Sequence, residues 1–218
     1  MLVTGIKSKP VYAPLRADTR GHYHLMLGKG MGNVALMRVL GELESAAPQA
    51  LARTRVLLIP AELSATPAAV SGPPPESPAA APPGDFAALG LEELRVFTDV
   101  PTLLRDFRAL LEVALMGTRL YVAGPESFIG LAMKIALEFD LNKDEIRAEE
   151  LGTLARRVYC IHCRTTTEEV RTNIVRCMDC GNWLLVRDHY SRRLAAYMGV
   201  MVDAEAPGER PEIKEVFL

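Results

Sequence analysis

Four cysteines in two pairs are the residues with the plainest chemistry in this chain. Cys160 and Cys163 form one Cys-x-x-Cys pair, and Cys177 and Cys180 form a second, with 13 residues between the pairs. Each pair makes a tight turn whose sulfurs converge, so two facing turns supply four thiolates to one tetrahedral metal ion. No other cysteine occurs in the sequence. This spacing is typical of a zinc ribbon and predicts a structural zinc site.

Two other states of the same sulfurs stay open at this point. Four thiolates in paired turns also suit a single iron, as in rubredoxin. Two disulfides are the third interpretation, although Cys-x-x-Cys pairs are poor structural bridges in a reducing cytosol. His162 lies inside the first pair, and we expect it to face solvent or to support a ligand, because four sulfurs already complete the shell. Gly181 is expected to relieve crowding where backbone amides turn toward the sulfurs.

A glycine-rich loop is the second candidate site. Gly28, Gly30 and Gly32 follow a strand-like run and precede a helix-like one. Glycines at such a junction let backbone amides approach a phosphate at the helix N-terminus. The loop could equally be a tight turn without a ligand. Gly124 and Pro125 occupy a second junction of the same kind.

The segments that would position these residues alternate between strand-like and helix-like patterns. In the first part of the chain, strands are predicted over 22–27, 55–59, 94–97 and 118–122, and helices over 34–45, 101–116 and 127–139. Such alternation indicates a parallel sheet covered by helices, so we predict a Rossmann-like α/β domain. Around the cysteines, strands are predicted over 165–170 and 172–175 as a hairpin, with a third over 182–187.

The composition changes near Gly152, where we place a domain boundary. We expect an α/β domain over 1–152, followed by a zinc ribbon and a C-terminal docking segment over 153–218. Residues 64–84 hold seven of the 15 prolines and are predicted to form a mobile extended loop within the first domain.

Composition limits the class of protein. The chain has 218 residues, 49% of them hydrophobic, which is enough apolar material for a core. A net charge of −2 is unlike that of a polycationic nucleic-acid binder. No apolar run approaches the roughly 18 residues of a membrane helix, and the first residues lack a secretory signal. We therefore expect a cytoplasmic protein with no membrane partner, and we do not expect nucleic acid to be its main partner.

The second junction resembles the nicotinamide-binding domain of the ferredoxin reductase family. Residues 120–128 read Leu-Tyr-Val-Ala-Gly-Pro-Glu-Ser-Phe, and residues 146–151 read Ile-Arg-Ala-Glu-Glu-Leu. In that family a strand ends in Cys-Gly-Pro, a helix follows, and an Ile-x-x-Glu strand closes the domain. The run Gly-Lys-Gly-Met-Gly-Asn-Val-Ala-Leu at residues 28–36 is similar to the family's Gly-Gly-x-Gly-x-Thr-Pro-Leu loop. The resemblance covers roughly residues 20–151.

Several departures from that family concern hydride transfer. Ala123 stands in place of the cysteine, Lys29 in place of a glycine, and Val34 and Ala35 in place of Thr and Pro. No Ser-Arg pair for a 2′-phosphate follows the 55–59 strand, and no flavin-binding barrel precedes residue 21. We therefore expect a domain that keeps the reductase shape and at most weak, vestigial cofactor binding, by Gly28, Gly30, Gly32, Gly124 and Pro125.

A second resemblance involves residues 189–205, which read His-Tyr-Ser-Arg-Arg-Leu-Ala-Ala-Tyr-Met-Gly-Val-Met-Val-Asp-Ala-Glu. This segment could pack on its own ribbon or dock a partner. Together with the ribbon and the degenerate reductase-like domain, it is similar to one of the subunit families of bacterial dimethylamine monooxygenases. The resemblance implies a non-catalytic, zinc-containing subunit, acting in assembly and docking, of a complex that demethylates dimethylamine to methylamine and formaldehyde with NADPH and O₂. Haem, FMN, an iron–sulfur cluster and NADPH are then expected only in sister subunits, one with haem and another with flavin and the cluster.

Two alternatives from other classes remain open. One is a nicotinamide-binding reductase subunit that transfers electrons, and the other is a nucleic-acid-binding protein that uses the basic ribbon. Whether the chain is itself an enzyme is therefore an open question at this point.

Overall fold

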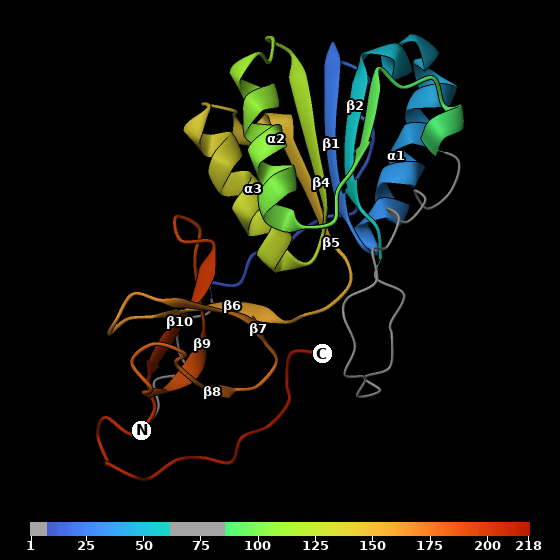
Figure 1. Cartoon of the computed structure of the whole chain (residues 1–218). Coiled ribbons are helices and arrows are strands. Elements are labelled where there is room, and N and C mark those ends of the chain that lie inside the picture. Colours follow the sequence, from blue (N-terminus) through green and yellow to red (C-terminus); the bar gives the residue numbers. More distant parts are fainter. Residues whose placement is uncertain (1–7, 62–85) are drawn as a thin grey trace, which may run out of the picture. The chain divides into compact units, whose positions relative to one another are not determined.

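A computed structural model describes residues 8–61 and 86–218, which form two compact units (Figure 1). The first unit combines the described residues up to Tyr12 with Pro125–Lys134 and Thr153–Leu218. The second unit combines Ala13–Gly124 with Ile135–Gly152. The proline-rich stretch 64–84 lies outside the described residues. No helix among the described residues is long and apolar enough to cross a membrane.

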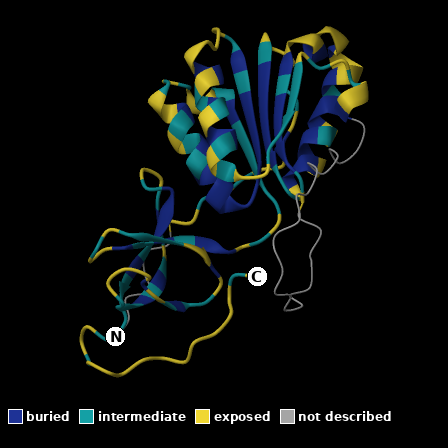
Figure 2. Ribbon diagram, viewed as in Figure 1, coloured by how far each residue is buried: buried dark blue, intermediate teal, exposed yellow. Residues whose placement is uncertain are grey.

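The second unit is built on a five-stranded parallel sheet. Its strands are β1 (Tyr23–Lys29), β2 (Thr54–Ile59), β3 (Glu93–Val96), β4 (Thr118–Gly124) and β5 (Ile146–Glu150). They lie in the order β3-β2-β1-β4-β5, and every neighbouring pair is parallel. This is the strand order of a Rossmann-like fold, so the predicted fold class of this part is confirmed. The central strands are buried on both faces, which explains why their sequences are apolar without alternation (Figure 2).

Three α-helices accompany this sheet: α1 (Gly32–Ala46), α2 (Val100–Glu112) and α3 (Glu126–Glu138). Short 3-10 helices η1 (Pro48–Arg53) and η2 (Phe86–Ala88) lie between α1 and α2, and η3 (Lys143–Glu145) lies between α3 and β5. Helix α1 buries Leu36, Val39, Leu40 and Leu43 completely, in the core cluster that also contains residues of β1, β2 and β4. Helix α3 begins in the first unit and ends in the second.

Helix α2 is four residues shorter at its end than predicted. It begins after the N-cap Asp99, whose carboxylate accepts a hydrogen bond from the Thr102 amide at 2.8 Å. It ends at Glu112, although the apolar sequence continues to Met116. The prediction to residue 116 was wrong because the chain must reverse before β4, and residues 113–117 form that turn.

The first unit carries a second five-stranded sheet. Its strands are β6 (Arg156–Cys160), β7 (Thr166–Val170), β8 (Ile174–Arg176), β9 (Trp183–Ser191) and β10 (Ala196–Met201). Their order is β7-β6-β10-β9-β8. The central pair, β6 and β10, is parallel, and the other pairs are antiparallel.

The pairing of these strands corrects the predicted hairpin. β7 pairs with β6 and β8 pairs with β9, so β7 and β8 are not neighbours. The physical reason is that each Cys-x-x-Cys turn reverses the chain, and the two strands that flank one turn therefore pair with each other. Strand β10 was not predicted. It occupies residues 196–201 of the segment 189–205, so this part of the segment packs within its own sheet.

A buried arginine organises the apolar side of this sheet, and no sequence motif pointed to it. The guanidinium of Arg156 lies 3.9 Å from the ring centre of Tyr197 and 3.8 Å from that of Phe217, and it bonds Asp188 at 2.7 Å. The amides of Val216 and Phe217 also donate to the Arg171 carbonyl. The last residues of the chain are thereby part of the first unit. The only sequence signal for Arg156 was its place at the start of an alternating, β-prone stretch.

Candidate functional site

The two cysteine pairs occupy turns with the same backbone hydrogen bonds. In each turn the amide of the first cysteine donates to the carbonyl five residues later, and the amide four residues later donates back to the carbonyl of that cysteine. These bonds are Cys160 N to Thr165 O at 2.9 Å, Arg164 N to Cys160 O at 2.9 Å, Cys177 N to Asn182 O at 2.8 Å and Gly181 N to Cys177 O at 3.2 Å. The first turn joins β6 to β7 and the second joins β8 to β9.

The residue after each pair has a left-handed backbone. Gly181 has a φ of 74°, and its counterpart in the first turn, Arg164, has a φ of 68°. A glycine adopts this conformation freely, whereas an arginine does so at a cost of about 1 kcal/mol. The second turn therefore has the residue that its geometry favours, and the first turn keeps the same shape with a less suitable residue.

The four sulfurs converge on one point. Cys160 Sγ lies 3.8 Å from Cys180 Sγ, and Cys163 Sγ lies 3.5 Å from Cys177 Sγ. All four sulfurs lie within 4.8 Å of one another. A tetrahedral ion with metal–sulfur bonds of about 2.3 Å requires sulfur separations of about 3.8 Å, so the donor set fits zinc, and equally a single iron. A disulfide requires about 2.05 Å, and all four cysteines are free.

The protonation of these thiols also favours a cation between them. The amide and hydroxyl of Thr165 lower the pKa of Cys163 to about 6. The amide of Asn182 lowers the pKa of Cys180, but desolvation and the other sulfurs outweigh it and raise this pKa to about 12. Desolvation also raises the pKa of Cys160. Sulfurs this close resist carrying four negative charges unless a cation compensates them.

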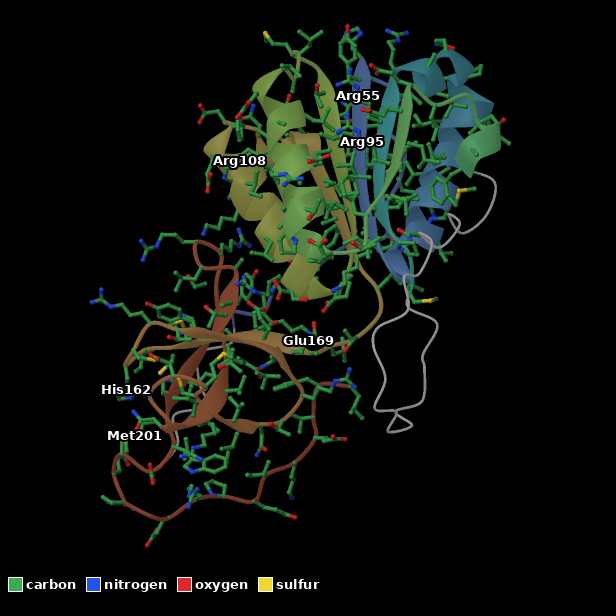
Figure 3. All side chains as sticks on the ribbon, in the orientation of Figure 1. Arg55, Arg95, Arg108, His162, Glu169 and Met201 are labelled. Atoms are coloured by element: carbon green, nitrogen blue, oxygen red, sulfur yellow. The ribbon has the colours of Figure 1, made fainter. Side chains whose placement is uncertain are left out.

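The site has a buried side and an exposed side. Cys160 and Cys177 are buried, whereas Cys163 is half-buried and Cys180 is exposed. His162 is exposed at the edge of this unit (Figure 3). The Thr165 hydroxyl lies 3.2 Å from a carboxylate oxygen of Asp179 and so links the two turns. Metal binding would therefore join both halves of the sheet at its cysteine end.

The glycine loop lies between β1 and α1, where two of its glycines serve close packing. A Cβ on Gly32 would lie 2.1 Å from the Ala123 carbonyl oxygen, and a Cβ on Gly28 would lie 2.2 Å from Asn33 Oδ1. Gly30 faces open space. The absence of a side chain at Gly32 thus allows α1 to approach the backbone of β4, and its absence at Gly28 leaves room for side chains of α1 beside β1.

Three backbone amides of this loop are bonded to carbonyls, one of β2 and two of the loop itself. Gly30 N donates to the Ile59 carbonyl at 2.9 Å, Asn33 N to the Gly30 carbonyl at 3.1 Å, and Val34 N to the Met31 carbonyl at 3.2 Å. The buried side chain of Asn33, a residue to which no sequence motif assigned a role, also donates to Ile59 O at 3.0 Å. These bonds hold the loop as a turn and leave fewer amides for a phosphate.

The second predicted junction, Gly124 and Pro125, lies at the end of β4 and the start of α3. Pro125 O accepts the amides of Phe128 and Ile129, at 3.0 Å each. In the first unit, this start of α3 packs closely against β9, since a Cβ on Gly130 would lie 2.1 Å from the Tyr190 hydroxyl. Burial and the Glu126 carboxylate raise the pKa of Tyr190. Glu126 is itself buried at this helix start, and its carboxylate lies beside Gly130 and Tyr190.

Comparison with protein families gives two matches. A model described as the N-terminal domain of "Dimethylamine monooxygenase subunit DmmA-like" proteins matches residues 75–146, and one for their C-terminal domain matches residues 157–200. Together they cover more than half of the chain. A curated relative from Ectopseudomonas mendocina (strain ymp), named "Heme-dependent oxidative N-demethylase delta subunit", is 35% identical over 111 residues. That alignment covers 51% of this chain and 63% of the relative.

Solved structures give weaker similarities. A ferredoxin reductase of carbazole 1,9a-dioxygenase matches 62% of this chain and 34% of its own, with 15% identity and a TM-score of 0.41. A flavohemoglobin from Malassezia yamatoensis matches 62% and 33%, with 15% identity and a TM-score of 0.38. The Amycolatopsis cytochrome P450 reductase GcoB matches 61% and 38%, with 13% identity and a TM-score of 0.40.

The two family models follow the architecture described above. The N-terminal model ends at the start of β5 and the C-terminal model spans β6 to β10 with both cysteine turns. The resemblance of the sequence to this family is confirmed: the chain belongs to the DmmA-like family of dimethylamine monooxygenase subunits.

Proposed function

We propose that this chain is a zinc-containing, non-catalytic subunit of a multi-subunit oxygenase that demethylates dimethylamine to methylamine and formaldehyde with NADPH and O₂. The observation that carries the proposal is a contrast inside the chain. Four cysteine sulfurs meet at metal-binding separations, whereas three amides of the glycine loop in the reductase-like unit are already bonded to carbonyls of the protein. A protein of this kind holds a metal for its structure and leaves redox chemistry to other subunits.

Cys160, Cys163, Cys177 and Cys180 would hold the zinc ion. Bound zinc supplies no redox chemistry, and four protein thiolates leave no coordination position for a substrate. The chain's own residues therefore join the β6–β7 and β8–β9 turns around one ion and fix the shape of the first unit. The proposal places the protein in the cytoplasm, where reducing conditions keep these sulfurs as thiols.

The relative from Ectopseudomonas mendocina supports a place in a larger assembly. Its printed name describes a delta subunit of a heme-dependent enzyme, which implies partner subunits in that protein. By analogy, we assign haem, FMN, the iron–sulfur cluster and NADPH to sister subunits of the present complex. The engaged amides of the glycine loop and the buried start of α3 support this assignment, because both would hinder a dinucleotide.

The test is co-purification of the tagged chain with the other oxygenase subunits from its own host, followed by metal analysis and an NADPH oxidation assay. We expect about one zinc per chain, dimethylamine-dependent NADPH oxidation by the complex, and none by the chain alone. Turnover by the isolated chain would contradict the non-catalytic role, and stoichiometric iron would replace zinc in the proposal.

A nicotinamide-binding reductase subunit is the competing function, and calorimetry separates the two. We expect no NADPH binding to the isolated chain. Tight binding that is lost when Gly30, which faces open space, is replaced by a bulky residue would favour the reductase function instead.

A further inference from the structure

One turn of the second unit exposes an unusual amount of apolar surface. It comprises residues 113–116 between α2 and β4, here called the Met116 turn. Val113 is 65% exposed, Leu115 58% and Met116 96%. These three side chains expose roughly 300–400 Å² of surface, the size of the largest apolar patch on a typical monomer, which is often functional. The turn is exposed in Figure 2, at the end of α2 that leads into β4.

Hydrogen bonds fix the Met116 turn in this outward shape. Ala114 N donates to Leu111 O at 3.1 Å, and Thr118 donates to Leu115 O through both its amide, at 3.2 Å, and its hydroxyl, at 2.6 Å. The carbonyl of the next residue, Gly117, accepts the His22 amide at 3.0 Å. The backbone thus keeps these apolar side chains exposed to solvent. A rigid apolar projection loses little conformational freedom when a partner covers it.

The surroundings indicate the chemistry of a partner. Beside the turn lies a notch of about 90 Å³, lined in part by Tyr23, Leu25 and Leu110. Arg53 also lines this notch and is exposed, and among the described residues no salt bridge involves it. A complementary surface would therefore offer an apolar pocket for Met116 and Leu115, and a carboxylate for Arg53.

The size of the patch argues against a second copy of this chain as the occupant. A stable dimer buries about 800 Å² on each partner, roughly twice what the Met116 turn offers. A small apolar anchor is sufficient where other contacts already hold two proteins in one assembly, because the local concentration is high. The patch thus fits a member of a larger complex better than a free-standing homodimer.

We propose that the Met116 turn docks into an apolar pocket of a sister subunit of the oxygenase, with a carboxylate of that subunit facing Arg53. This inference rests on the proposed function, since it requires the complex. It assigns a role to a turn that neither the cysteine site nor the glycine loop explains. The turn is also formed by the apolar residues that were predicted to extend α2.

The experiment is co-expression of the tagged full chain with the other subunits, carrying Met116→Glu or Val113→Glu. Val34→Glu is the matched control, because Val34 is 61% exposed in the same unit. We expect at least about a tenfold loss of co-purified sister subunit with the two turn variants and none with the control. Arg53→Glu should cause a smaller loss that grows as salt is lowered. Unchanged melting temperature and metal content would show that the variants fold.

Several results would overturn the inference. Full recovery of sister subunits with both turn variants would do so, as would a loss of self-association without a loss of sister subunits. If the unmodified chain recovers no sister subunit, the proposed function fails as well, whereas a complex that tolerates both turn variants contradicts only this inference.

Discussion

The cysteine turns and the glycine loop are both tight backbone turns at strand ends, yet their polar groups point in different directions. In the cysteine turns, the amides of Thr165 and Asn182 face sulfurs, and the four sulfurs face one another. In the glycine loop, the amides of Asn33 and Val34 bond carbonyls of the loop itself. The polar groups of the cysteine turns meet at one point between their side chains, whereas the amides of the glycine loop bond the loop's own backbone. A binding site is thus better recognised by where its polar groups aim than by the residue types that form the turn.

The two regions also differ in what maintains them. Four thiolates at these separations repel one another without a cation, so we expect the first region to depend on metal binding, which is worth about 10 kcal/mol or more in small zinc domains. The glycine loop is maintained by close packing of α1 on β4, with single contacts worth a few kcal/mol. Metal removal and packing substitutions should therefore affect different units.

The largest expected effect follows loss of one buried ligand. Cys177→Ser should abolish zinc binding and unfold the first unit, because a buried hydroxyl cannot replace the thiolate and the metal joins both turns. The fluorescence of Trp183, the chain's single tryptophan, reports this unit. Zinc should fall from about one per chain to none, and chelation of the unmodified protein should give the same spectrum.

Cys180→Ser should weaken zinc binding less than Cys177→Ser, since Cys180 is exposed and water can complete the coordination shell of the metal. A Cys177→Ser protein that retains both zinc and a native spectrum would contradict the dependence of this unit on the metal.

A single methyl group added in the glycine loop should lower the unfolding free energy of the second unit. Gly32→Ala places a Cβ 2.1 Å from the Ala123 carbonyl oxygen, so α1 must move away from β4, at a cost of about 2–4 kcal/mol in unfolding free energy. Gly41→Ala in the same helix meets nothing within 4 Å and should instead stabilise by about 0.5–1 kcal/mol. Denaturant unfolding followed by far-UV circular dichroism measures both. Equal effects of the two substitutions would show that Gly32 is not needed for packing.

These two regions also show how far the sequence could be interpreted. The order of strands and helices in the second unit was predictable because apolar strands and amphipathic helices differ in period. The meeting of the four cysteines was predictable from their spacing alone, because each pair closes a turn independently of the rest of the fold. The ends of the elements shifted by a few residues, and α2 ended earlier because tertiary structure requires a turn before β4.

Other features depend on contacts between distant residues, and no local pattern contained them. The hairpin of 165–170 with 172–175 was wrong because pairing follows the cysteine turns rather than neighbourhood along the chain. Strand β10 was missed because its parallel partner β6 lies about 40 residues away. The use of Gly32 for packing could not be separated from phosphate binding, since both require a residue without a side chain.

Low pH should destabilise the second unit through a single buried carboxylate. Asp18, in the second unit, accepts bonds from Arg20 at 3.0 Å, Arg147 at 2.6 Å and Arg119 at 3.1 Å, and these hold its pKa well below the usual range. A lowered folded-state pKa stabilises the protein above the unfolded value of about 4, and this stability is lost as pH falls below it. Asp18→Asn should cost about 2 kcal/mol at pH 7 and remove this part of the acid dependence.

The measurement is urea unfolding between pH 7 and pH 2.5, followed by the helical signal of the second unit. The advantage of the unmodified protein over Asp18→Asn should begin to shrink below about pH 4 and should keep shrinking down to pH 2.5, without vanishing there, because the folded-state pKa of Asp18 lies lower still. A constant difference across this range would show that the arginines do not act through the Asp18 carboxylate.

The smallest expected effect concerns a difference between the two cysteine turns. Arg164 and Gly181 share a left-handed backbone, so their substitutions should act in opposite directions. Arg164→Gly should raise the unfolding free energy of the zinc-bound protein by up to about 1 kcal/mol, and Gly181→Ala should lower it by about 1 kcal/mol. Space does not limit the second change, because the nearest atom to a Cβ on Gly181 is Arg176 Nη2 at 3.6 Å.

Arg164→Ala is the control for this pair, because it removes the arginine side chain and keeps the backbone cost. It should leave stability nearly unchanged, and competition with a chromogenic chelator should rank zinc retention in the order Arg164→Gly, unmodified, Gly181→Ala. If Arg164→Ala stabilises as much as Arg164→Gly, the gain comes from loss of the side chain and not from the backbone. The two turns would then match in their hydrogen bonds but not in the conformational cost that their shared geometry predicts.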